Sequence, residues 1–208
     1  MTIHKLAFEV SNVMANVKFF LDTGALIALS SLKGSDLQIF KTRIEAYNPE
    51  ISVTHVQVDE TINEKYERKL RNYQQVIDKA LESLTKKGIA VHVEPTKIGA
   101  WSISRWDYFK WGGEETGKLY EELRNEIDRC EEAKGKTKTL LNIACDAVIA
   151  VSSLDHDFFV TCDECLFDSW RNVIDKNRMF RQQFKIPKVI YARPYPKEVA
   201  KAVLQILS

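Results

Sequence analysis

A three-layer α/β/α fold with a central parallel sheet is predicted by two observations. Short apolar runs of strand length alternate along the chain with longer helical patterns, the arrangement that gives parallel sheets with helices on both faces. In addition, the 208 residues are 45% hydrophobic, which is enough apolar material for one core or for two small ones. The same composition, with only 8 Gly and 5 Pro, excludes disordered and collagen-like chains.

The period of the apolar residues assigns the elements in order. The predicted strands are residues 17–21, 51–53, 89–93, 158–161 and 189–191. The predicted helices begin with one that opens at 25–29 and continue with 36–47, 54–70, 72–87, 114–134, 139–154, 163–176 and 198–207. Thr54 and Gln57 have the spacing of a capping box, so the third helix is expected to begin at Thr54.

The chain is expected to form a single domain over residues 1–208, with an insertion at about 96–138 whose helix is too polar to bury a core alone. Residues 1–16 fit either a helix or a loose arm. No apolar run approaches the roughly 20 residues that span a bilayer, and the opening residues lack a signal-peptide pattern. With only four Cys, a cytoplasmic protein without membrane contact is expected.

Charge is distributed unevenly along the chain, although the net charge is only +1. Residues 171–201 carry nine basic side chains and two acidic ones, so the rest of the chain is net negative. This asymmetry indicates either a basic surface for a polyanion beside an acidic site, or simply a solvated C-terminal surface.

Three acidic residues lie where predicted strands give way to helices. Asp22 follows the first strand, Asp163 follows the fourth, and Glu60 lies in the second turn of the helix after the second strand. Because sites in parallel α/β sheets form at the carboxyl ends of the strands, these side chains are expected at a common rim.

A fourth acidic residue, Asp146, stands in an otherwise uncharged run at 143–151. On a helical wheel its face also carries Asn142 and Ser153, while the other faces are apolar. So thin a polar stripe indicates that Asp146 faces an enclosed polar site rather than solvent. A lone buried carboxylate is costly or becomes protonated, and a nearby cation reverses that penalty.

Four carboxylates at one rim repel one another, and hard divalent ions remove that repulsion. Mg²⁺ and Mn²⁺ prefer oxygen ligands, activate bound water and hold phosphate oxygens. The acidic residues therefore predict a Mg²⁺ or Mn²⁺ site for a phosphate substrate. The alternative is that four residues picked from 29 acidic ones share no site at all.

Four segments resemble, in order, the motifs of PIN-domain nucleases. The matching segments are residues 20–29, 56–60, 146–150 and 159–163, which carry Asp22, Glu60, Asp146 and Asp163. The first reads as a strand, an Asp and an apolar helix, and the last as a strand that ends in Thr-x-Asp. The resemblance covers roughly residues 17–93 and 139–191, and the insertion lies outside it.

This resemblance implies an endoribonuclease that hydrolyses single-stranded or structured RNA, with the four acidic residues as catalytic groups and as ligands of Mg²⁺ or Mn²⁺. It also implies a VapC-like toxin with an antitoxin protein as partner, and we add a homodimer as a further expectation. Thr161 is expected to orient a ligand, a water or the substrate. Asp59 and Glu164 adjoin proposed ligands and are the alternatives if the assignment shifts by one residue.

Contacts to RNA are expected from two other regions. Arg178 and Arg181, in the basic stretch, are the candidate phosphate contacts. The insertion carries Trp101, Trp106 and Trp111. These rings either stack on unpaired bases or fill a core, and filling a core is the commoner role of buried aromatic residues.

Two other functions remain open at this point. The chain could be a catalytically inactive PIN-like module that binds RNA or protein. Cys162 and Cys165 also form a C-x-x-C between a strand and a helix, the arrangement of a thiol redox site. The two acidic residues between the thiols disfavour a thiolate there.

Overall fold

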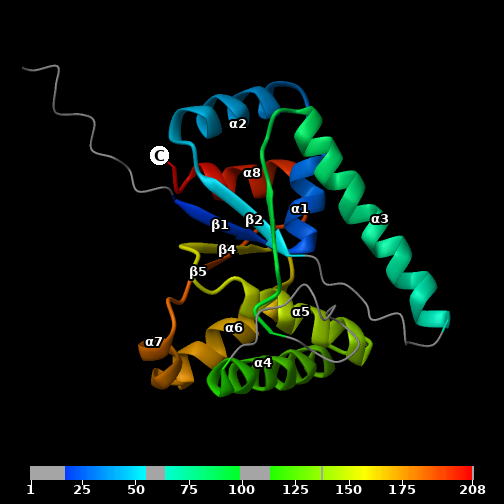
Figure 1. The fold of residues 1–208 in the computed structure, drawn as a ribbon, viewed down its shortest axis with the longest axis vertical. Helices are drawn as coiled ribbons and strands as arrows, with labels where there is room; N and C mark the ends of the chain where they lie inside the picture. The colour runs from blue at the N-terminus through cyan, green and yellow to red at the C-terminus, as the bar shows by residue number, and fades with distance from the viewer. Residues whose placement is uncertain (1–16, 55–63, 99–112, 137, 208) are drawn as a thin grey trace, which may run out of the picture.

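A computed structural model describes residues 17–54, 64–98, 113–136 and 138–207, which form one sheet with helices on both faces (Figure 1). The sheet has the order β3-β2-β1-β4-β5, and all its neighbouring strands are parallel. The strands are β1 (Lys18–Leu21), β2 (Glu50–Thr54), β3 (His92–Glu94), β4 (Phe158–Thr161) and β5 (Lys188–Tyr191). The predicted three-layer α/β/α fold is confirmed.

The helices form two layers, one on each face of the sheet, and the last helix returns to the layer of the first (Figure 1). One layer contains α1 (Thr23–Ser30), α2 (Gly34–Tyr47), α3 (Glu64–Lys86) and α8 (Pro196–Leu204). The other contains α4 (Glu114–Ala133), α5 (Leu140–Ser152), α6 (Glu164–Lys176) and α7 (Arg178–Gln183). Because the connections from β1 to β3 lie in the first layer and those from β3 to β5 in the second, the order of strands reverses between β1 and β4.

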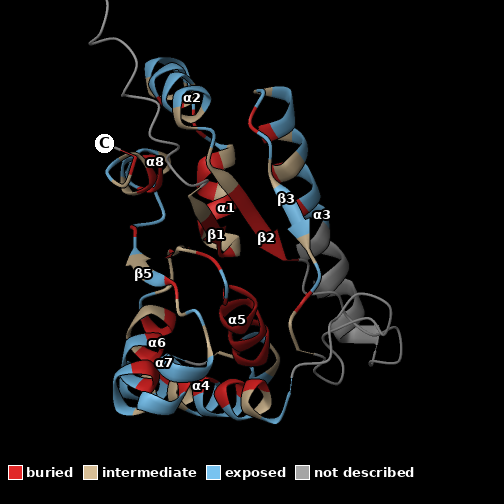
Figure 2. Ribbon diagram, turned by 60° about the vertical axis from the view of Figure 1, so that its left-hand side comes forward, coloured by how far each residue is buried: buried red, intermediate tan, exposed pale blue. Residues whose placement is uncertain are grey.

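Alternation of side chains along β1 builds the two cores. Phe19 and Leu21 point to the layer of α1, while Phe20 points to the layer of α5, as the period of a strand requires. All three are at most 1% exposed. A strand buried on both faces reads as a continuous apolar run, which is why residues 17–21 were recognisable from the sequence. Figure 2 shows the buried strands between helices whose outer faces are exposed.

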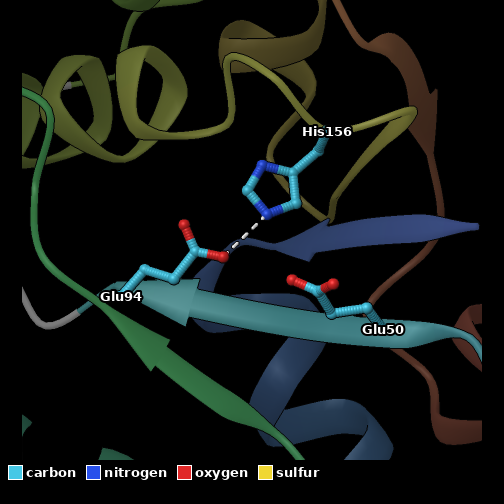
Figure 3. A group of neighbouring side chains, drawn as sticks. All are labelled: Glu50, Glu94 and His156. Atoms are coloured by element: carbon cyan, nitrogen blue, oxygen red, sulfur yellow. Dashed lines mark hydrogen bonds and ion pairs between the residues drawn. The ribbon is translucent and has the colours of Figure 1, made fainter. Parts of the chain in front are cut away.

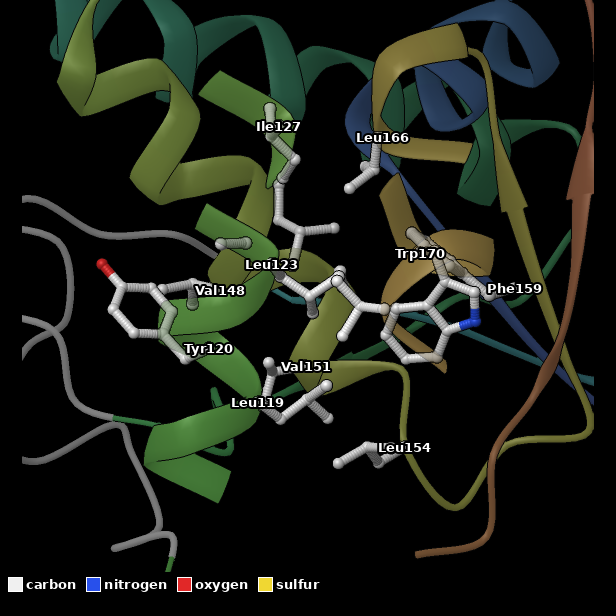
Figure 4. Packing of buried hydrophobic residues seen from close by; sticks show 14 of the residues in the cluster. Leu119, Tyr120, Leu123, Ile127, Val148, Val151, Leu154, Phe159, Leu166 and Trp170 are labelled. Carbon is white, nitrogen blue, oxygen red and sulfur yellow. The ribbon is translucent and has the colours of Figure 1, made fainter. Parts of the chain in front are cut away.

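The described part of the expected insertion contributes to the second core. Leu119, Leu123 and Ile127 of α4 are fully buried against α5 and α6 (Figure 4). Trp170 of α6 fills the same core and meets Phe159 edge-to-face at 5.9 Å. The polar helix thus shares a core with its neighbours and builds none of its own. Residues 99–112, with the three tryptophans of that segment, lie outside the described residues.

The predicted helix start at Thr54 stays a prediction, because residues 55–63 lie outside the described residues. Thr54 itself is the last residue of β2, and its hydroxyl donates to the backbone carbonyl of Glu94 at 2.9 Å, so it bridges two strands. The predicted break near Leu70 is wrong, because α3 is continuous from Glu64 to Lys86. No glycine or proline interrupts it, and it ends before Gly88, which has a φ of +75°.

None of the helices in the described ranges combines the length and the apolar character needed to cross a membrane.

Gly24 provides a test of the close approach between α1 and the end of β4. A Cβ at position 24 would lie 3.0 Å from the Cβ of Cys162, which is attached to backbone and has little room to move. We therefore expect Gly24→Ala to lower the free energy of unfolding by about 1–2 kcal/mol. Gly117→Ala, in α4 with open space around it, should instead raise it by up to about 1 kcal/mol. Urea unfolding of both variants measures the difference, and equal effects would contradict the close packing.

Candidate functional site

The candidate site lies where the order of strands reverses, at the carboxyl ends of β1 and β4. Asp22 follows β1 directly, and Asp163 follows β4 with one residue between. The two strands pair in register, with Leu21 opposite Val160. In open parallel sheets, ligands bind in the crevice at this point because the connections on its two sides run to opposite faces. Two of the predicted acidic residues therefore occupy the expected position in the sheet.

Asp22 is held in place by three hydrogen bonds from neighbouring groups. Its Oδ1 accepts from the backbone N–H of Ala25 at 2.6 Å, which caps α1, and its Oδ2 accepts from the Thr161 hydroxyl at 2.5 Å and the Cys162 N–H at 2.9 Å. Burial nevertheless raises the pKa of Asp22, and the charge of Asp163 adds to that rise. The three donors fix the carboxylate in one orientation at the end of β1.

Thr161 lies beneath the site and has no exposed surface. Its hydroxyl donates to Asp22 and accepts from the backbone N–H of Asp163 at 3.0 Å, so it links the two carboxylate-bearing turns. Thr161 is therefore placed to orient the ligand-bearing residues. A side chain without exposed area does not itself touch a substrate.

Asp163 caps α6 and meets a lysine that the sequence analysis did not single out. Its Oδ1 accepts from the Leu166 N–H at 2.9 Å, and its Oδ2 accepts a short hydrogen bond from Lys138. Burial opposes ionisation of this carboxyl, but Lys138 and the backbone donor outweigh it and lower the pKa of Asp163 below its ordinary value. Asp163 therefore carries a negative charge at neutral pH.

Asp146 projects from α5 toward the same lysine, as its thin polar stripe predicts. Its Oδ2 lies 2.8 Å from Lys138 Nζ, and its side chain is 21% exposed. Burial raises the pKa of Asp146 to about 7 against the opposing effect of Lys138, and the negative charges of Asp163 and Asp22 contribute to the rise. The three aspartates thus act on one another electrostatically across one site.

Lys138 supplies the positive charge at the centre of this group. Its ammonium contacts Asp146 and Asp163, and it lies 3.4 Å from Glu131, which α4 buries to 3% exposure. Burial lowers the pKa of Lys138, but the two aspartates outweigh burial and raise it above its ordinary value. In the sequence Lys138 is one of several lysines before α5, and only its position eight residues before Asp146 hints at a contact.

The three aspartates do not bring their oxygens together as one compact set of metal ligands. Within the part of the chain that the structure describes, two groups of at least three side chains bring their potential metal-ligand atoms within 4.8 Å of each other. One is Glu131, Asp163 and Cys165, and the other is Glu50, Glu94 and His156 at a different place in the sheet. Neither group contains Asp22 or Asp146, and Lys138 contacts both Asp146 and Asp163.

The fourth predicted ligand, Glu60, and its alternative Asp59 fall in residues 55–63, outside the described residues. Glu164, the other alternative, points away from the aspartates and pairs with Lys134 at 3.1 Å while 56% exposed. Of the two candidates at the start of α6, Asp163 is therefore the one that faces the site.

The predicted phosphate contacts lie far from the aspartates. Arg178 and Arg181 are on α7, which follows the last turn of α6, whereas Asp163 precedes the first turn. The 13 residues of α6 separate these two ends by about 20 Å, and α7 lies at the other end of the sheet (Figure 1). Arg181 also pairs with Asp175. A contact to both regions thus requires an extended ligand.

The two thiols of the C-x-x-C are free, Cys162 partly exposed and Cys165 buried. Burial raises the pKa of the Cys162 thiol to about 12, with added effects from Asp22 and Asp163. Burial also raises the pKa of Cys165 to about 12, together with Cys130 and Glu131. A redox thiol needs a lowered pKa to form a thiolate, so these environments weigh against that function.

The chain matches no protein-family model, and comparisons with curated proteins and with solved structures found no match either. The resemblance to PIN-domain nucleases therefore stays a prediction from four short segments.

The Thr161 hydroxyl offers a test of how the site is held together. We expect Thr161→Val to lower the free energy of unfolding by about 1–3 kcal/mol, because it removes a donor from Asp22 and an acceptor from the Asp163 N–H. Thr161→Ser keeps the hydroxyl and should cost only about 1 kcal/mol for the lost methyl group. Urea unfolding gives both values. A larger loss in the serine variant would show that packing, not hydrogen bonding, is the role of Thr161.

Proposed function

We propose that this protein is a metal-dependent endoribonuclease of the PIN type, as its sequence motifs suggest. The observation that carries the proposal is that Asp22, Asp146 and Asp163 lie close enough for their charges to act on one another, at the point where the order of strands reverses, and that two of them share Lys138. They follow β1, lie on α5 and follow β4, respectively, so only the folded sheet brings them together.

The residues present suit a hard divalent ion. Their donors are carboxylate oxygens, the ligands that Mg²⁺ and Mn²⁺ prefer. Asp146, Asp163 and Glu131 face a single lysine in this part of the described structure. Burial raises the pKa of Asp146, and the negative charges of Asp163 and Asp22 add to the rise. The Lys138 ammonium already occupies a place for a cation. Asp22, Asp146 and Asp163, with Glu60 by resemblance, would hold the ion.

A bound Mg²⁺ or Mn²⁺ would supply an activated water and stabilise negative charge on the phosphate. The chain itself supplies orientation. Thr161 and two backbone N–H groups fix Asp22, and the Leu166 N–H fixes Asp163. Lys138, if displaced from the carboxylates, places a positive charge next to the phosphate. The arrangement is thus pre-oriented for in-line hydrolysis.

The partners and the biological setting follow the same proposal. The substrate would be single-stranded or structured RNA, and a toxin role with an antitoxin partner, a homodimer and a cytoplasmic location remain part of the proposal from the sequence. The four free cysteines in the described residues suit a reducing compartment.

A second candidate function is an inactive module that binds RNA or protein. The observation that favours it is Lys138, which neutralises two of the aspartates without any metal. In this case the lysine replaces the ion permanently, and metal binding is weak.

Asp146→Asn tests the nuclease proposal. We expect wild-type protein to cleave mixed RNA with Mn²⁺ and not after chelation, and Asp146→Asn to lose at least about 100-fold of the rate, since it removes a charged metal ligand. Asp78→Asn, on the exposed face of α3, is the matched control and should cleave at the wild-type rate. Gel analysis of RNA over time provides the measurement. Cleavage by Asp146→Asn at the wild-type rate would contradict the site assignment, and no cleavage by wild type favours the inactive module.

Lys138→Met separates the two candidates without measuring activity. Removal of the ammonium leaves Asp146 and Asp163 unneutralised, so the metal-free variant should be less stable than wild type. If the site binds a divalent ion, Mn²⁺ should raise the melting temperature of Lys138→Met more than that of wild type. Lys134→Met, which removes ion pairs with Glu164 and Asp168 on the surface of α6, serves as the control and should respond to Mn²⁺ like wild type. An absence of any Mn²⁺ effect on Lys138→Met would argue against a metal site.

A further inference from the structure

A second group of polar side chains lies beneath the β2–β3 half of the sheet, apart from the aspartates. Glu50 and Ser52 point to the same face of β2, since side chains alternate along a strand. Glu94 closes β3, and His156 approaches from the turn between α5 and β4 (Figure 3). The potential ligand atoms of Glu50, Glu94 and His156 all lie within 4.8 Å of one another.

The orientation of His156 makes its Nε2 the group that faces the carboxylates. Its Nδ1 lies 3.1 Å from the carbonyl oxygen of Ser153 and 3.3 Å from that of Leu154. Carbonyls only accept, so Nδ1 carries a hydrogen and a neutral ring keeps its lone pair on Nε2. A hydrogen bond from Nδ1–H to a backbone carbonyl is the usual support of a metal-binding histidine. The ring is 3% exposed and meets Phe20 edge-to-face at 5.0 Å, which fixes it further.

The contact between His156 and Glu94 requires a positive charge between two acceptors. Nε2 lies 3.0 Å from Glu94 Oε1, and contact with His156 lowers the pKa of Glu94 to about 2, so the carboxylate is ionised at neutral pH. Either a proton on Nε2 or a metal ion satisfies both atoms. The neighbouring groups decide which of the two fits better.

Glu50 and Ser52, the neighbours of this pair, favour a metal ion over a proton on Nε2. Glu50 brings a second carboxylate to the same imidazole, and a single proton on Nε2 serves only one of them. Ser52, which is fully buried and shares its face of β2 with Glu50, has a hydroxyl without a hydrogen bond of ordinary geometry, although it is close enough to Glu94 to help lower the pKa of that carboxyl. The nearby cations are Lys18, 2.9 Å from Glu50 and 43% exposed, and Lys97, which pairs with Asp155.

We propose that Glu50, Glu94 and His156 Nε2 bind a divalent transition-metal ion of the Zn²⁺ class. One nitrogen and two carboxylate oxygens suit Zn²⁺ or Co²⁺ and differ from the all-oxygen set of the aspartate site. Ligand atoms of a tetrahedral site with bonds of about 2.1 Å lie about 3.4 Å apart, so small side-chain movements close the group. Glu50 then exchanges Lys18, whose side chain is free to turn into solvent, for the ion. The fourth position is left for water or the Ser52 hydroxyl.

Zinc titration of the chelated, full-length protein tests this site. Calorimetry should show saturable binding of Zn²⁺ that persists in Asp163→Asn, which changes only the aspartate site. Co²⁺ should give the visible absorption of tetrahedral coordination. Glu50→Gln, at a partly exposed position where folding is not at risk, should weaken Zn²⁺ binding at least about tenfold, and Glu94→Gln likewise. Glu45→Gln, on the exposed face of α2, is the matched control and should bind like wild type.

Two outcomes would overturn the proposal. One is the absence of saturable Zn²⁺ binding to wild type, which leaves His156 and Glu94 as a hydrogen-bonded pair without an ion. The other is binding by Glu50→Gln equal to that of wild type, which places the ion elsewhere. Neither outcome bears on RNA cleavage, so the test is independent of the nuclease proposal.

Discussion

Burial of the Asp22 carboxylate at the junction of β1 and β4 is the constraint on which the candidate site depends. The carboxylate is 5% exposed, and two of the groups that satisfy it, the Thr161 hydroxyl and the Cys162 N–H, are about 140 residues away in sequence. Those donors reach it only when the two strands pair in register. Pairing, burial and orientation of the carboxylate are therefore one event, and the same event brings Asp163 to the site.

Contact with Lys138 affects the protonation of the two aspartates beside it. Asp163 stays ionised next to the lysine, whereas Asp146, more deeply desolvated, has a pKa near neutrality. Two chemically identical side chains thus differ in protonation because of burial and neighbours alone.

Local sequence patterns were sufficient for the strands that carry the site, for α5 and for the positions of Asp22, Asp146 and Asp163 in the fold, because the period of apolar residues in the sequence follows directly from burial of a strand or helix. Local patterns failed where a partner far away in the sequence determines the contacts of a side chain. The Thr54 hydroxyl donates to the carbonyl of Glu94 on the neighbouring strand, a contact across 40 residues that no local pattern shows. Lys138 gains its role from Asp163, 25 residues away. The distance of Arg178 and Arg181 from the site is set by the length of α6, which adjacency in sequence conceals.

Asp22 and Asp163 each cap a helix, α1 and α6 respectively, whose first turn points at the crevice. The positive ends of two macrodipoles therefore meet there and offset some of the crowding of like charge. Asparagine caps a helix about as well as aspartate, whereas alanine does not. Alanine at either position would therefore remove the helix cap together with the carboxylate, so fraying of α1 or α6 and loss of the charged group could not be told apart. Asparagine removes the charge and keeps the cap.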